Sequence, residues 1–426
     1  MGVGFMFIFS ATFTASFIEV IVFKDFNRHG IDGKTGFYAL SLTYGCLGLA
    51  NWFAPAVVNK LGCRISLFLS AIPYIAILFS LVNPYLWSLF TLTVLVGAGG
   101  GVLWTANGEV IAKNSPGDTK AKNTGIFWSW YCTSMLLGNF FLYFYLGNSE
   151  KISDAQRHVI YLVLGVFCAI GMCCFLLLAP SGTPQVEDKE ESSYGVVTEP
   201  QSVLQPIINA AKFCKTWQMG FLYAPIIFAG VSENFWTSVF TTVIGNVYPD
   251  RSYMALGGMC TGIGEISAGF IWGRLTSNIG RHGVIMCSTV INCCLYYLAF
   301  ISFPFDAATT TASIAADNPI IPSNIYLTMA MGVMLGLGDG GFCVSIYAAL
   351  STIFEENPAP AFGVYNFVKC TTSAVAFLYC GHLLLPFQLG ILAVTCLVGC
   401  VCFITLERYP SQVLLVNAED SRLWRI

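Results

Sequence analysis

The chain has 426 residues, of which 56% are apolar and only 10% are charged, and its formal net charge is -3. Soluble globular proteins average about 45–50% apolar and about 25% charged residues, so the composition excludes a soluble enzyme and a disordered chain. With 20 Lys and Arg residues and no basic excess, it also excludes a nucleic-acid binder. A multi-pass α-helical membrane protein remains.

The first half of the chain consists of apolar runs, each about long enough to cross a bilayer. The first run has no basic segment before it, so it predicts a retained helix and not a cleaved signal. The runs are 2–23, 37–59, 65–82, 86–112, 124–147 and 158–179. They predict a bundle of six transmembrane helices over residues 1–180.

A polar segment, 181–216, separates these runs from the rest and predicts a solvated linker. Its last part, 203–215, has the apolar spacing of an amphipathic helix at a membrane surface. Six more runs follow, at 217–246, 254–272, 283–303, 325–353, 361–385 and 388–406. We therefore expect a second six-helix bundle over 217–406 and a tail over 407–426.

Basic residues predict the orientation, because loops rich in Lys and Arg resist translocation. If both termini are cytoplasmic, the inner segments hold thirteen Lys and Arg residues and the outer loops hold six. We therefore expect an integral membrane protein whose termini and linker are all cytoplasmic. Which cellular membrane holds it is not predicted.

Two segments of the chain look like copies of each other. Residues 97–101 are almost all glycine, and Gly125 follows, with Cys132 seven residues later; residues 336–341, Gly363 and Cys370 repeat this arrangement. Parallel repeats of six spans are the construction of major facilitator transporters. The predicted fold is therefore an all-α major facilitator fold, with 12 transmembrane helices in two six-helix bundles.

A second pair of segments resembles the inner-loop signature of that superfamily, in a degraded form. They are 55–64 and 269–281. The resemblance implies a hinge on the cytoplasmic side at these residues: Asn59, Gly62, Arg64, Arg274, Gly280 and Arg281.

Three further segments resemble the Unc-ninety-three-like family of this superfamily, closest to its major-facilitator-domain-containing branch. They are the sequence GVLWTANGE at 101–109, GIFW at 125–128 and GLGD at 336–339. Asn107 stands where that family often has Gln. The resemblance implies the major facilitator fold and leaves two functions open, because the family includes orphan transporters and non-transporting helpers of channels or receptors.

Charged side chains inside a bilayer cost at least ~2.5–3.5 kcal/mol each, so each needs a reason. Glu265 lies in mid-span without an evident partner, which makes it the first candidate for a proton-carrying group. Glu19 and Glu233 lie at similar depths in the first helix of each bundle and are further candidates, although Glu19 is close enough to the helix end to reach outer water.

Asp339 and Lys369 lie at comparable depths in neighbouring spans, which predicts a buried ion pair between them. The pair either fixes helix packing or breaks when a solute or proton arrives. Glu109 lies four residues before Lys113, so a pair at the helix end explains its charge.

Four other side chains are candidates for lining a cavity, although packing is the plainer explanation for each: Trp104, Asn107, Trp128 and Trp236. The motif GxxxG predicts close helix contacts at 97–101, 258–262, 269–273 and 336–340.

No catalytic residues, metal site or cofactor are predicted. The cysteines lie mostly within apolar runs, with no CxxC or HExxH spacing, and fit small packing residues. We expect a secondary transporter of a small solute that works by alternating access, with proton coupling as an option. The alternative is a non-transporting regulatory or trafficking partner of another membrane protein, such as an ion channel or receptor.

Overall fold

The computed structural model describes residues 1–114, 120–178, 214, 216–309, 319–354 and 358–408, and all of its regular elements are helical. The helices of the first half are α1 (Gly2–Phe26), α2 (Gly33–Leu61), α3 (Cys63–Ser80), α4 (Leu86–Lys113), α5 (Lys120–Leu146) and α6 (Asp154–Leu176). Those of the second half are α8 (Trp217–Asn234), η2 (Phe235–Val239), α9 (Phe240–Val247), α10 (Ser252–Ser302), α11 (Ile325–Ile353), α12 (Pro358–Cys380) and α13 (Leu385–Arg408). The predicted amphipathic helix at 203–215 falls almost wholly outside the described residues.

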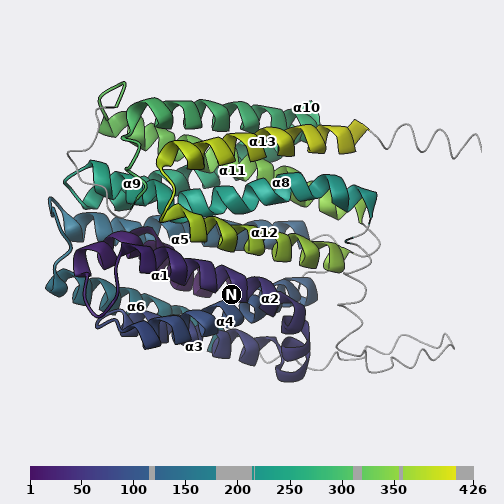
Figure 1. The fold of residues 1–426 in the computed structure, drawn as a ribbon. Helices are drawn as coiled ribbons and strands as arrows, with labels where there is room; N and C mark the ends of the chain where they lie inside the picture. Colours follow the sequence, from purple (N-terminus) through teal and green to yellow (C-terminus); the bar gives the residue numbers. More distant parts are fainter. Residues whose placement is uncertain (115–119, 179–213, 215, 310–318, 355–357, 409–426) are drawn as a thin grey trace, which may run out of the picture.

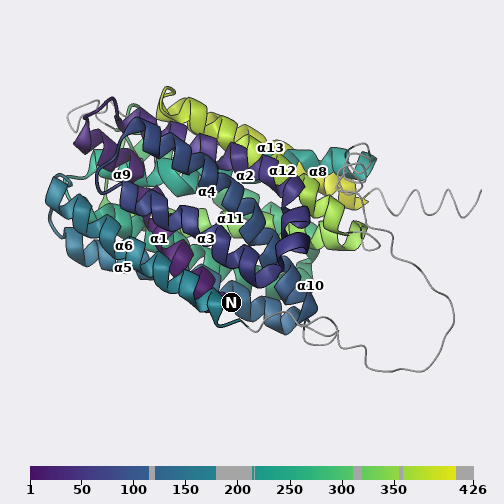
Figure 2. The same cartoon turned by 90° about the horizontal axis from the view of Figure 1, so that it is seen from below.

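The helices run side by side along one common direction (Figures 1 and 2). Within the described ranges, seven are long and apolar enough to cross a membrane: α1, α3, α4, α6, α10, α11 and α13. The 51 residues of α10 form two helices, 252–279 and 281–302, joined at the non-helical Gly280. At about 1.5 Å of rise per residue, each of them is long enough to cross a hydrocarbon core of about 30 Å. Each apolar run of the sequence coincides, apart from a few residues at its ends, with a helix or a succession of helices. The exact count of twelve crossings stays a prediction.

Two glycines reverse the chain at equivalent places in the two halves. Gly62 joins α2 to α3 with φ 77°, and Gly280 interrupts α10 with φ 71°. Both lie in the left-handed region that only glycine adopts without strain. Each glycine belongs to one copy of the predicted inner-loop motif, so the stretched second copy still makes the same turn.

Glycine stripes let the helices of each half pack closely. A Cβ at Gly97 in α4 would lie 2.5 Å from the Thr43 carbonyl oxygen of α2, and one at Gly336 in α11 would overlap the Thr261 carbonyl oxygen of α10. The α2–α4 and α10–α11 contacts are therefore equivalent, as the repeat predicts.

One of the four predicted GxxxG contacts is wrong. Gly269 and Gly273 have no atom of another described element within 4 Å of where a Cβ would lie, whereas Gly258 packs against Phe17 and Gly262 against Met135. Spacing alone does not say which helix faces carry a neighbour.

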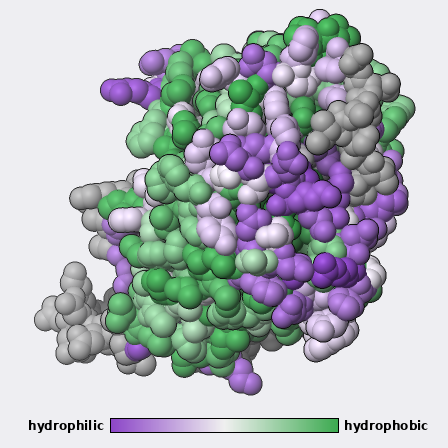
Figure 3. All heavy atoms as spheres, turned by 90° about the vertical axis from the view of Figure 1, so that its left-hand side faces the viewer, coloured by the Kyte–Doolittle hydropathy of each residue, from purple (hydrophilic) through white to green (hydrophobic). Residues whose placement is uncertain are grey.

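The two halves meet mainly along two helix pairs, α2 with α12 and α5 with α10, and α1 also contacts η2, α9 and α10. In Figure 1 the second half lies above the first, with α5 and α12 near the join. We call the end of the molecule that carries residues 27–32, 147–153 and 248–251 the Arg251 end, and the opposite end, with Gly62 and Gly280, the Arg281 end. Figure 3 faces the Arg251 end, where hydrophilic side chains gather on part of the surface.

Candidate functional site

An ion pair crosses the interior of the second half. Lys369 of α12 lies 3.4 Å from Glu233 of α8, and the two side chains are 18% and 15% exposed. The Ser373 hydroxyl lies 3.2 Å from Glu233 Oε2. The predicted pairing of Lys369 with Asp339 is therefore wrong, because Glu233, two residues before the π-helical segment η2, is the carboxylate that reaches Lys369.

Asp339 instead faces a second carboxyl group. Its side chain and that of Glu265 on α10 interact directly, and Glu265 Oε2 lies against Gly340. Asp339 is 5% exposed and receives a weak hydrogen bond from Cys343 Sγ at 3.7 Å. Glu265 Oε1 and Asp339 Oδ1 are buried without a hydrogen-bond donor among the residues that the structure describes.

The ion pair and the carboxyl pair belong to one group. Glu265 also interacts electrostatically with Lys369 and Glu233, and Cys343 interacts with all four charged residues. We call Glu233, Glu265, Asp339 and Lys369 the charge cluster. It holds three carboxyl groups and one ammonium group, contributed by four helices of the second half.

The equivalent place in the first half holds no charged side chain. Asp339 corresponds to Gly100 in the repeat, where a Cβ would lie 2.8 Å from the Tyr74 hydroxyl and 2.9 Å from Leu47 of α2. Ala50 faces Gly101 there, just as Ala268 faces Gly340 in the second half. The same helix packing is thus built without charge, so packing alone does not explain the charges of the second half.

Aromatic side chains of α1, α4 and α5 form a cluster in the first half. We call Phe9, Phe13, Trp104, Trp128 and Tyr131 the aromatic wall. The Tyr131 ring centroid lies 5.1 Å from that of Trp104 and 5.2 Å from that of Trp128, with both pairs edge-to-face. The three rings are only partly buried. Tyr131 interacts electrostatically with two members of the charge cluster, Glu233 and Lys369, so Tyr131 is the member of the wall within electrostatic range of the cluster.

Two other predicted lining residues are buried. Trp236, within η2, is 6% exposed and lies 5.7 Å from Phe13 between ring centroids. Its Nε1 has no hydrogen-bond partner in the described ranges, and neither does Oδ1 of the buried Asn107. A role for either residue in lining a cavity stays a prediction.

Glu19 lies apart from the charge cluster. It is buried on α1 and interacts with Tyr161 of α6, within the first half. Across the described residues no interaction joins it to Glu233, so equal depth along the first helix of each bundle did not bring the two carboxyl groups to a common site.

Glu109 forms the helix-end pair that its spacing predicts. Its Oε1 lies 2.5 Å from Lys113 Nζ, and this hydrogen bond holds the pKa of Lys113 above its ordinary value. The carboxylate is thus explained by local pairing at the end of α4.

The arginines of the inner-loop motif bind helix ends within their own halves. Arg64 donates to the Leu176 carbonyl oxygen of α6 at 2.5 Å. Arg281 donates to the Ala348 carbonyl oxygen and pairs with Glu407 of α13, both at 3.0 Å. Asn59 and Arg274 are exposed; the predicted hinge itself stays a prediction.

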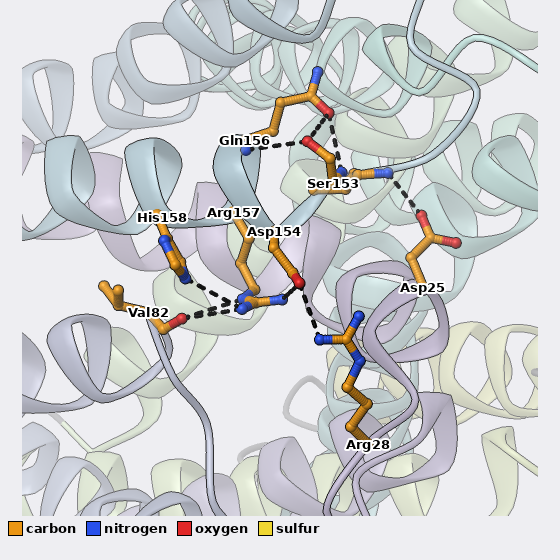
Figure 4. Close-up of polar contacts among 9 residues, drawn as sticks. Asp25, Arg28, Val82, Ser153, Asp154, Gln156, Arg157 and His158 are labelled. Carbon is orange, nitrogen blue, oxygen red and sulfur yellow. Dashed lines mark hydrogen bonds and ion pairs between the residues drawn. The ribbon is translucent and has the colours of Figure 1, made fainter.

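At the Arg251 end, polar contacts cross from one half to the other. Asp25 of α1 pairs with Arg251 across the two halves. Its carboxylate also accepts a hydrogen bond from the Ile152 amide at 3.0 Å (Figure 4). Lys24 Nζ donates to Asn246 Oδ1 at 2.6 Å. Sequence reasoning missed this network, although a signal existed: acidic and basic neighbours occur at the same connection of both halves, at 24–25 and 250–251.

A buried arginine, Arg157, links helix ends of the first half next to this network. Arg157 donates to Asp154 at 2.5 Å and to the Val82 carbonyl oxygen (Figure 4), and its guanidinium lies 4.4 Å from the Phe26 ring centroid. Arg28 reaches the same Asp154 from the neighbouring connection at 3.0 Å. The helix ends of the first half are therefore fixed beside Asp25.

Solved structures define the class of protein. The structure resembles a POT family transporter in complex with 5-aminolevulinic acid, with a TM-score of 0.65 at 14% identity over 95% of each chain. It also resembles the nucleoside transporter NupG, with a TM-score of 0.64 at 12% identity over 96% of this chain and 98% of that one. The protein is an all-α integral membrane protein with the major facilitator fold.

The family follows from the sequence comparisons. A family model described as "Ion channel regulatory protein UNC-93" matches residues 27–404. The chain is 32% identical to UNC93-like protein MFSD11 of Xenopus laevis, over 98% of this chain and 97% of that one. It is 23% identical to Protein unc-93 homolog A of Bos taurus, over 84% and 82%. The chain belongs to the UNC-93 family, as its motifs at 101–109 and 125–128 predict.

Proposed function

We propose that this protein is a proton-coupled secondary transporter of a small organic solute, with the proton carried by Glu265 and Asp339. The observation behind the proposal is the buried carboxyl pair, in which each partner has an oxygen without a donor. A carboxylate can only accept hydrogen bonds, whereas a protonated carboxyl group can donate one. A proton held between the two groups supplies the missing donor.

Charge balance supports the same assignment. The ammonium of Lys369 is already paired with Glu233, which leaves Glu265 and Asp339 without a cation of their own in the charge cluster. Two like charges in a buried site raise each other's energy, and one of them takes up a proton. Leu47 and Gly100 at the equivalent place of the first half support a role beyond packing.

Alternating access is the mode of transport that we propose. Contacts between the halves at the Arg251 end, through Asp25 and Arg251, correspond to a conformation closed at that end. Arg64 and Arg281 bind only within their own halves among the contacts described at the other end. In the proposed mechanism the bundles at 1–180 and 217–406 rock about the central site. In the proposed topology the termini are cytoplasmic, so the closed Arg251 end is the outer one.

The test is solute uptake into proteoliposomes across a broad solute panel, with and without an imposed pH gradient. We expect uptake that requires the gradient, and its loss in Glu265→Gln and Asp339→Asn. Glu109→Gln is the matched control, because it removes a helical carboxylate that pairs with Lys113 and does not belong to the charge cluster. Uptake that is equal with and without the gradient, or unchanged in both variants, rejects proton coupling at this pair.

The family model's description supports a second candidate, a regulatory subunit of an ion channel. In that case the charge cluster fixes helix packing and nothing is carried. Correctly folded protein that moves no member of the panel, yet alters the current of a co-expressed potassium channel, would establish this alternative.

A further inference from the structure

We infer that the solute is an organic monocation, with an ammonium group on an aromatic or apolar body, which exchanges with a proton at the Glu265–Asp339 pair. This inference rests on the proposed function and names the class of solute for the same site.

The acceptor oxygens of the pair define the chemistry that completes it. Asp339 is 95% buried, and its Oδ1 is buried without a donor from the described residues. An N–H or a cationic methyl group of an ammonium compensates the same charge that a proton compensates. Replacing one proton by one monocation leaves the total charge of the site unchanged, so the exchange adds no buried charge.

An anionic solute is disfavoured by the same cluster. Lys369 is the one basic member, and it lies 3.4 Å from Glu233, which also receives the Ser373 hydroxyl. A solute carboxylate would have to displace Glu233 from Lys369 and would then meet three carboxyl groups. Like charges placed together in this way cost several kcal/mol at an interface.

The aromatic wall supplies the other half of a cation site. Ring faces attract cations within about 6 Å of the centroid, and Trp binds most strongly. Trp104 and Trp128 stack with their centroids 6.1 Å apart and are partly exposed. Tyr131 interacts with Glu233, and the next residue, Cys132, interacts with Glu265. Met135, one turn after Tyr131 on α5, packs against Gly262 of α10, less than one turn before Glu265. The helix that carries Trp128 and Tyr131 therefore borders the helix that carries Glu265.

A divalent metal ion fits the site less well than an organic cation. Mg²⁺ and Ca²⁺ require about six or more oxygen ligands, whereas the pair offers two carboxyl groups. Within the described residues no group of three or more His, Cys, Asp or Glu side chains is arranged to hold a metal ion.

The experiment is equilibrium binding to the full chain in lipid nanodiscs. The probe is phenethyltrimethylammonium, whose charge does not change with pH, compared with its uncharged tert-butyl analogue and with 3-phenylpropionate. We expect only the cation to bind, about one proton to be released per cation, and up to tenfold tighter binding per unit of rising pH, because fewer protons then compete.

Variants separate the two parts of the site. Glu265→Gln and Asp339→Asn are expected to abolish proton release and weaken cation binding at least about tenfold. Trp104→Leu is expected to weaken binding about 3- to 30-fold while proton release persists. Glu109→Gln is the control and is expected to match wild type in both measurements.

The outcomes distinguish this inference from the proposed function. Binding of 3-phenylpropionate but not the cation, or cation binding without proton release, overturns the inference. Binding of Ca²⁺ or Mg²⁺ in place of the organic cation also overturns it. Proton-coupled uptake of another solute with no cation binding leaves the proposed function standing alone. Cation binding with proton release but no flux upholds the site and rejects transport.

Discussion

Asp25 of α1 and Arg251, just before α10, form an ion pair of 3.3 Å whose side chains are only 6% and 8% exposed. Arg251 also donates to the Gly245 carbonyl oxygen, and its backbone amide donates to Ser149 at 2.8 Å. This one arginine therefore links the end of α9, the connection before α6 and the end of α1. The link joins the two halves of the repeat.

Removing Asp25 leaves the guanidinium of Arg251 buried without its carboxylate. Breaking a buried ion pair from one side costs about 3–5 kcal/mol, so we expect Asp25→Asn to lower the unfolding temperature in detergent. Arg28→Gln is the control, because the Arg28–Asp154 pair at the same end is 62% and 46% exposed and surface pairs contribute about 0–1 kcal/mol. Equal unfolding temperatures for the two variants would show that the Asp25–Arg251 pair stabilises nothing.

Gly336 allows α10 and α11 to touch. An added Cβ would overlap the Thr261 carbonyl oxygen, and overpacking of this kind typically costs about 1–3 kcal/mol. Gly336→Ala is expected to reduce thermal stability and monodispersity on size-exclusion chromatography. Gly269→Ala, where nothing lies within 4 Å of a Cβ, is expected to behave like wild type or slightly better. A similar loss in both variants would mean that helix contact is not the cause.

Glu233 and Lys369 are expected to be coupled in stability. Lys369→Met leaves a buried carboxylate and Glu233→Gln leaves a buried ammonium, so each single change is expected to cost more than the double change. A coupling free energy of about 0.5–3 kcal/mol is typical of residues in contact. Chemical unfolding of the three variants measures it, and strictly additive effects would contradict the pairing.

The termini are expected to face the cytoplasm. In the plasma membrane of intact cells, or in sealed vesicles whose cytoplasmic face is on the inside, a C-terminal epitope should bind antibody only after permeabilisation. An epitope placed in the 147–153 connection should bind without permeabilisation. The reverse pattern would refute the orientation predicted from the distribution of Lys and Arg.

The fold could be predicted from sequence because its determinants are local or repeated. Apolar runs place the helices, and the glycines at 97–101 and 336–340 mark the same packed contact twice. The GxxxG motif at 269–273 was misleading. Such a motif shows that a helix face lacks side chains, but it does not show whether another helix packs against that face.

The partners within the site could not be predicted from sequence. Depth along a span placed Asp339 and Lys369 at one level, but rotation about each helix axis decides which side chains meet. That rotation brings Glu233 to Lys369 and Glu265 to Asp339. The candidate residues were thus found as a set, while the pairing needed coordinates.

The contrast between Glu265 with Asp339 and Leu47 with Gly100 has a consequence for stoichiometry. A duplicated unit in which both copies kept acidic groups would hold two titratable sites, related by the axis between the halves. Here the axis relates a pair of carboxyl groups to a place where Leu47 and Gly100 carry no acidic group. The symmetry therefore governs how the halves pack. In the proposed mechanism, the number of protons exchanged in each transport cycle is limited to what one carboxyl pair can hold.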